Sequence, residues 1–205
     1  MPLVQDRKTK YFESYIEING ETFSINADIN KGIYIEILER FVSQLDIALC
    51  IHKRLLVIRV DLHLNKFSAD NKVISRFMNR LKQWLKRNYG LNKIGYIWVR
   101  EKAKSQNQHY HLALLLDENK IRHPKRLNVQ IKEMWLPYGH MPTVINPYYN
   151  INTHKDNYQA IRKEVIQRVS YLAKVSTKRK RDKQTKDYQT SRLKNDSNLY
   201  QQKKA

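Results

Sequence analysis

One stretch determines how the rest of the chain is interpreted: Gln108-His109-Tyr110-His111-Leu112-Ala113-Leu114-Leu115-Leu116. Successive side chains of a β-strand point to opposite faces of a sheet. His109 and His111 therefore share one face with Ala113, while Tyr110 points to the other face with alternate leucines. The predicted strand is polar at its first end and apolar at its second end. That pattern predicts a sheet with a site near one edge and a core below it.

The segments around this stretch predict an α+β domain. Residues 94–101 form a second predicted strand, joined to residues 108–116 by a polar turn at 102–107, so the two strands make a hairpin. Residues 55–64 alternate as a further strand, with Leu56 and Ile58 on one face. Apolar residues recur at helical spacing in four other segments. The expected fold is a mainly antiparallel central sheet flanked by helices over residues 32–50, 70–88, 125–136 and 156–175.

Charge divides the chain and points to a polyanionic partner. The 205 residues carry a net charge of +20 with a pI of about 10.0, which favours nucleic acid first and an anionic membrane second. Residues 1–50 carry five basic and eight acidic side chains, residues 51–173 carry 23 and eight, and residues 174–205 carry 11 and three. We expect residues 1–50 to be an N-terminal extension that contains a helical segment and packs on a domain of residues 51–175. Residues 176–205 are expected to be a basic, disordered tail.

Several classes of protein are excluded by composition. A single cysteine, Cys50, excludes a disulfide framework and fits a reducing compartment. Apolar runs such as Leu112–Leu116 are far too short to span a bilayer, and the first residues lack the apolar core of a signal peptide. We therefore expect a cytoplasmic protein with no membrane partner.

The His-x-His pair is the first candidate site. Two imidazoles on one face of a strand lie about 7 Å apart along the backbone and can converge on one divalent cation. The hairpin returns both residues beside Glu101, which ends the preceding strand. Two imidazoles and one carboxylate suit Mg²⁺, Mn²⁺ or another borderline divalent ion. Ordinary packed or solvated histidines, with Glu101 as a solvated charge at a strand end, would give the same sequence.

A helical pair and a strand face supply further candidates. Tyr171 and Lys174 are spaced i, i+3 on the last helix, where a phenol can act as a nucleophile and an ammonium can stabilise a phosphate. The alternative is a tyrosine at the edge of the core. Arg59, Asp61 and His63 form the polar face of strand 55–64 and are possible site support. An exposed strand face is the alternative for this trio.

The order of these motifs resembles a known superfamily. The HUH-superfamily replication initiators have three motifs in a fixed order. An apolar strand comes first, a strand with His-hydrophobic-His comes second, and a later helix with Tyr-x-x-Lys comes third. The match rests on residues 55–64, His109-Tyr110-His111 and Tyr171-x-x-Lys174. The chain looks most like the inovirus (filamentous-phage) replication initiators, the group that includes the YagK/YfjJ C-terminal domain. Tyr110 stands where many members have a bulky aliphatic residue, and only one tyrosine is placed in the helix.

The resemblance implies an activity, a fold and a substrate. It implies a Rep-type domain with an RRM-like palm, which nicks and joins single-stranded DNA at a replication origin through a 5′-phosphotyrosine link and so starts rolling-circle replication. Host replication proteins would be further partners. Tyr171 and Lys174 would be catalytic, and Glu101, His109 and His111 would hold Mg²⁺ or Mn²⁺. The basic side chains expected to contact DNA are Arg100, Lys102, Lys104, Lys178, Arg179, Lys180 and Arg181.

Other functions share the same sequence features. A non-catalytic DNA-binding regulator would keep the fold and the charge without the chemistry. A transposase or relaxase of the HUH superfamily would use the same residues on a different DNA. A basic ribosome- or RNA-associated protein would explain the charge but not the order of the His pair, Glu101 and Tyr171.

Overall fold

The sheet predicted from strand alternation forms the centre of the molecule. The computed structural model describes residues 9–27, 32–102, 108–121, 124–175 and 186–194. The three predicted strands are β5 (Arg54–Leu64), β6 (Gly95–Lys102) and β7 (Gln108–Asp117). Their bounds differ from the predicted bounds by one residue at most. The prediction of an α+β fold with a mainly antiparallel sheet is confirmed.

Strand β7, which carries the His-x-His pair, lies between β6 and β5. The sheet has the order β10-β6-β7-β5-β8, and β9 (Tyr148–Asn152) pairs with another part of β5. Strands β8 (Gly139–His140) and β10 (Tyr188–Thr190) are its short outer members. All of these pairings are antiparallel. A site on β7 can therefore receive side chains from neighbouring strands on both sides.

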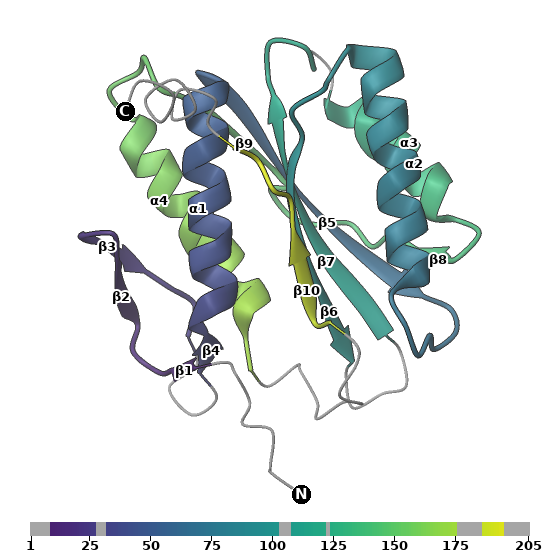
Figure 1. Ribbon diagram of the computed structural model, residues 1–205, viewed down its shortest axis with the longest axis horizontal. Helices are drawn as coiled ribbons and strands as arrows, with labels where there is room; N and C mark the ends of the chain where they lie inside the picture. The colour runs from purple at the N-terminus through teal and green to yellow at the C-terminus, as the bar shows by residue number, and fades with distance from the viewer. Residues whose placement is uncertain (1–8, 28–31, 103–107, 122–123, 176–185, 195–205) are drawn as a thin grey trace, which may run out of the picture.

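Helices cover both faces of the sheet (Figure 1). Helices α1 (Ile35–Ile51) and α4 (Tyr158–Ser170) pack on one face, against side chains such as Val57, Val99 and Leu115. Helices α2 (Lys72–Tyr89) and α3 (Pro124–Trp135) pack on the other, against side chains such as Trp98 and Leu112. Burial of apolar side chains on both faces explains why β7 is apolar along most of its length. None of the helices in the described ranges is long and apolar enough to cross a membrane.

The N-terminal segment belongs to the same core. Strands β2 (Tyr15–Ile18) and β3 (Glu21–Ser24) form a hairpin, and β1 (Lys10–Tyr11) pairs with β4 (Ile33–Tyr34) just before α1. The segment therefore contains β-strands as well as a helix. The domain boundary predicted at residue 50 falls inside α1. Arg162 of α4, only 5% exposed, forms ion pairs with Asp46 of α1 and Glu21 of β3. The described part of residues 1–50 is therefore an integral layer of the domain.

Part of the predicted tail is ordered, which corrects the prediction of disorder over 176–205. Strand β10 pairs with β6, with Gln189 opposite Trp98. Ser191 is 6% exposed, and its hydroxyl donates a hydrogen bond of 2.6 Å to Gln44 of α1. The segment is short and polar, so its sequence resembled a solvated tail. The remaining residues of 176–205 lie outside the described ranges.

Gly139 permits a close backbone approach that ties β8 to the end of β5. A Cβ at this position would lie 1.8 Å from the carbonyl oxygen of His63. Gly139→Ala is expected to lower the free energy of unfolding by about 1–3 kcal/mol, because the two backbones must separate. Urea unfolding measures the loss, with Ser75→Ala on the exposed side of α2 as the control. A change within about 0.5 kcal/mol for Gly139→Ala would contradict this account.

Candidate metal centre and its tyrosine

Strand register brings the predicted metal ligands together. His109 lies opposite Glu101 of β6 on one side and His63 of β5 on the other. His111, two residues further along β7, lies opposite Asp61 of β5. All five side chains leave the same face of the sheet, because paired residues and residues at i, i+2 share a face.

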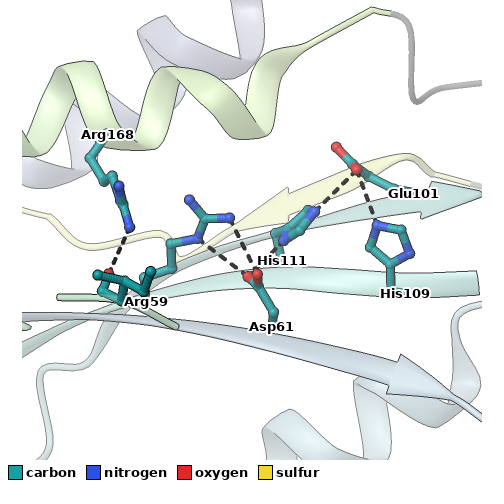
Figure 2. Close-up of polar contacts among 7 residues, drawn as sticks. Arg59, Asp61, Glu101, His109, His111 and Arg168 are labelled. Atoms are coloured by element: carbon teal, nitrogen blue, oxygen red, sulfur yellow. Dashed lines mark hydrogen bonds and ion pairs between the residues drawn. The ribbon is translucent and has the colours of Figure 1, made fainter. Parts of the chain in front are cut away.

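Glu101 lies between the two imidazoles of β7. Its Oε2 is 3.2 Å from His109 Nε2 and 3.1 Å from His111 Nε2 (Figure 2). The three ligand atoms all lie within 4.8 Å of one another. Glu101 is 2% exposed and His111 is 5% exposed, so this charged group lies in the interior. A buried carboxylate that faces two imidazole nitrogens is a donor set that could hold a divalent metal ion.

Asp61 orients His111 from the opposite side of its ring. Its Oδ1 lies 2.7 Å from Nδ1 of His111, and Arg59 holds the same carboxylate at 3.3 Å. Nδ1 therefore donates to Asp61, which directs Nε2 towards Glu101. Carboxylates behind metal-bound histidines fix the ring and its tautomer in this way. Asp61 therefore holds the ring of His111 in place, and Arg59 in turn holds the carboxylate of Asp61.

Electrostatics in this network keep Asp61 ionised. Burial alone would raise the pKa of Asp61, but the hydrogen bond from His111 and the charges of His111 and Arg59 lower it to about 2. Burial opposes the charged form of His111, yet its hydrogen bonds to Asp61 and Glu101 raise its pKa. The two carboxylates therefore create a negative environment that favours a cation.

A substitution at Asp61 tests this arrangement. Asp61→Asn keeps an acceptor for His111 but loses the negative charge, so the affinity for Mn²⁺ is expected to fall about 10- to 100-fold. Titration calorimetry with Mn²⁺ alone measures the change. The matched control is Asp117→Asn, which changes a carboxylate 3.7 Å from His52 at the far end of β7. Equal Mn²⁺ affinities for wild type and Asp61→Asn would contradict a supporting role.

Tyr171 lies beside the candidate metal ligands. Helix α4 ends at Ser170, and Tyr171 belongs to a short 3₁₀ turn (Tyr171–Ala173) instead of the longer helix predicted. The helix ends where the buried hydroxyl of Ser170 accepts a hydrogen bond of 2.8 Å from the backbone of Asn26. The Tyr171 ring packs edge-on against the His111 ring, with 6.1 Å between centroids. The turn thereby places a phenol next to the innermost histidine.

Two cations flank the Tyr171 ring. Nζ of Lys174 lies 4.0 Å from the ring centroid, and the guanidinium carbon of Arg59 lies 5.2 Å from it. Such contacts are cation–π interactions, which hold the ring and the cations in fixed positions. The structure therefore brings together Tyr171, Lys174 and Arg59, all named from sequence, at the His111 side of the ligand set.

Two further histidines, His63 and His140, lie on the other side of His109. The ring of His63 stacks on that of His109, with 4.9 Å between centroids, and His140 of β8 contacts His63 at the same separation. Burial and the neighbouring imidazoles of His109 and His140 lower the pKa of His63. Among the described residues, the group of side chains that could hold a metal ion consists of Glu101, His109 and His111 and does not include His63 or His140. His140 was not predicted, because its place beside His63 depends on the two-residue strand β8.

The predicted DNA contacts are not all at the surface. Arg100 is 3% exposed, and its guanidinium donates to the backbone carbonyls of Ser68 and Ala69 and to Gln108. It ties the loop before α2 to the sheet, so the prediction that it contacts DNA is wrong. Its position on the Trp98 face of β6 was the signal for burial. The other predicted contacts fall outside the side chains that the structure describes: Lys102, Lys104, Lys178, Arg179, Lys180 and Arg181.

Comparisons with known proteins place the chain in a family. Residues 19–188 match the family model of the YagK/YfjJ C-terminal domain. The chain is also similar to a protein of Escherichia coli (strain K12) named "Uncharacterized protein YfjJ". The two are 27% identical over 179 residues, which cover 68% of this chain and 86% of the relative. The family match spans most of the chain and includes every residue of the candidate metal centre and of the tyrosine turn. The chain belongs to the YagK/YfjJ C-terminal domain family.

Proposed function

We propose that the chain is a metal-dependent endonuclease that nicks and rejoins single-stranded DNA to start rolling-circle replication of a phage, prophage or other mobile element. The observation that carries the proposal is the packing of Tyr171 against His111, one of three grouped ligands, with 6.1 Å between the ring centroids. A tyrosine in that position is a nucleophile placed beside a phosphate-binding centre. The resemblance to HUH-type replication initiators supports the same reading through the order of its motifs.

The fold supports the proposal through the position of β7. A central antiparallel strand carries the His pair, and a turn after a helix on the same face carries the tyrosine. This is the arrangement expected of a Rep-type domain with an RRM-like palm. The net charge of residues 51–173, with 23 basic and eight acidic side chains, fits a strand of DNA as the partner.

The proposed cofactor is Mg²⁺ or Mn²⁺ held by Glu101, His109 and His111. Two imidazole nitrogens and a carboxylate oxygen suit either ion and leave positions open for substrate. When bound, the ion would supply Lewis-acid polarisation of a phosphate oxygen. Asp61 would keep the proton of His111 on Nδ1, and Glu101 would offset part of the cation's charge.

Tyr171 would carry out the covalent step. Its phenol oxygen attacks the scissile phosphorus, an O–P bond forms to the tyrosine, and the bond from phosphorus to the 3′ oxygen breaks. The phenol proton passes to water, and the departing 3′ oxygen takes up a proton. The products are a 5′-phosphotyrosine link and a free 3′-OH. A later attack by a 3′-OH reverses the exchange, so rejoining needs no external energy source. Arg59 and Lys174, which flank the ring, would attract the phosphate and stabilise its developing charge.

A random-sequence library of single-stranded DNA tests the proposal without knowledge of the origin. The library carries a label at its 3′ end, because that end stays with the fragment that would be linked to the protein. After incubation with the full chain and Mn²⁺, a denaturing gel separates free DNA from adduct, and the adducted DNA is sequenced. We expect a labelled band at the protein's position and one enriched sequence. Binding of the library with no adduct would contradict the proposal and favour a non-catalytic regulator.

A further inference from the structure

A basic groove lies away from the metal centre, between α2 and the outer strand β10. The groove encloses about 670 Å³, within the range of ligand-binding clefts. One wall is formed by α2 and the other by the segment that contains β10, while Tyr96 of β6 lies at its base. The residues that matter for recognition are Lys82, Lys86, Tyr96, Gln189 and Arg192.

The described residues that line the groove carry positive charge only. They include Lys82, Lys86 and Arg192 and neither aspartate nor glutamate. Helix α2 as a whole carries six basic residues and no acidic residue. Lys82 and Lys86 are spaced i, i+4, where like charges repel one another and destabilise a helix. An anion bound between them would relieve this repulsion.

The wall of the groove that contains β10 is held in a fixed position. The backbone of Ser191 donates to the carbonyl of Tyr96 at 2.8 Å, and the backbone of Tyr96 donates to the Ser191 hydroxyl at 3.0 Å. Gln44 of α1 accepts from both Ser191 and Leu193. These bonds fix the backbone on either side of Arg192 opposite α2. A preformed groove loses less entropy on binding than a loose surface.

The groove and the metal centre are separate sites. Tyr96 and Glu101 are five residues apart on β6, or about 16 Å at the usual strand rise. Being an odd number of residues apart, they point to opposite faces of the sheet. Consistently, Tyr96 packs with the α2 and α3 layer, whereas Val99, on the Glu101 face, packs with the α1 and α4 layer.

We propose that this groove is a second nucleic-acid site, which binds the sugar–phosphate backbone of a strand away from the position of cleavage. Lys82, Lys86 and Arg192 contact phosphates from the two walls, and the amide of Gln189 offers hydrogen bonds to sugar or base. Backbone contacts of this kind give affinity and position without reading sequence. The binding needs neither a metal ion nor Tyr171, so it holds or fails independently of the proposed cleavage.

Paired variants of the same helix test the groove against a general effect of charge. Lys82→Gln/Lys86→Gln removes two charges from the groove. Arg76→Gln/Arg80→Gln removes two charges from exposed positions of α2 that do not line it. The affinity of the full chain for a labelled 30-nucleotide single strand is measured by fluorescence anisotropy in EDTA at several salt concentrations. Circular dichroism melting checks that both variants fold as the wild type does.

The two variants are expected to differ. The groove variant should lose at least about 10-fold in affinity, and its salt slope should fall by about 1.4, as for two lost phosphate contacts on a single strand. The control should lose less than about 3-fold. Arg192→Gln, in the opposite wall, should weaken binding in the same way as one lysine. Equal losses in both helix variants would overturn the proposal. Competition by a free nucleoside monophosphate as effective as that by the unlabelled strand would also overturn it.

Discussion

Tyr171→Phe is expected to abolish the covalent adduct with single-stranded DNA, with a loss of at least about 1,000-fold in its rate of formation. The substitution removes only the attacking oxygen. The remaining ring still packs against His111 and lies under Lys174, so the fold and the metal centre are retained. DNA binding and Mn²⁺ affinity should therefore stay within about twofold of wild type, because neither depends on that oxygen in the proposed mechanism.

A second tyrosine on the same face provides the control. Tyr158 begins α4, packs against the same core, and has its hydroxyl 2.6 Å from Gln159. Tyr158→Phe should form the adduct at the wild-type rate. An adduct with Tyr171→Phe at more than a tenth of the wild-type rate would assign the nucleophile to another residue.

Glu101→Gln is expected to lower the affinity for Mn²⁺ by at least about 100-fold, because a ligand loss should exceed the effect of a supporting residue. Glu101 is 2% exposed and its Oε2 lies near both histidine nitrogens, so the neutral amide occupies the same space without the charge. The adduct should fall with the loss of the ion, and raising the Mn²⁺ concentration should restore part of it.

A second glutamate, Glu118, provides the control for the general loss of a negative charge. Glu118 forms an ion pair with Arg54 beyond the other end of β7, and Glu118→Gln should bind Mn²⁺ as wild type does. Calorimetry with Mn²⁺ in the absence of DNA gives the affinities. Unchanged Mn²⁺ binding by Glu101→Gln would remove Glu101 from the ligand set and contradict the proposed centre.

Strand alternation predicted the central elements of the fold and most of the candidate site. The faces of β5 and β7 were readable because each strand alternates, so Asp61, His109 and His111 could be assigned to faces before any pairing was known. The pairing of β5 with β7 was not readable, since the connection between them is long and contains α2. The contact between Asp61 and His111 is therefore a result of the structure alone.

Two of the strands that were not predicted are short and polar. Strands β8 and β10 have two and three residues, and neither has an apolar period that could reveal it. Their places depend on neighbours: Gly139 fits against the backbone of His63, and Ser191 bonds to Gln44 of α1. The burial of Arg100 was also not predicted. The charge of Arg100 suggested a contact with DNA, whereas its position on the Trp98 face of β6 indicates burial.

Mapping the attached residue tests the central claim most directly. Adduct formed with Mn²⁺ and the sequence enriched from the single-stranded library is digested with a nuclease and a protease, and the modified peptide is identified by mass spectrometry. The account predicts a nucleotide linked through phosphate to Tyr171. A nucleotide on any other residue, or no modified peptide from wild-type protein that binds both Mn²⁺ and DNA, would contradict it.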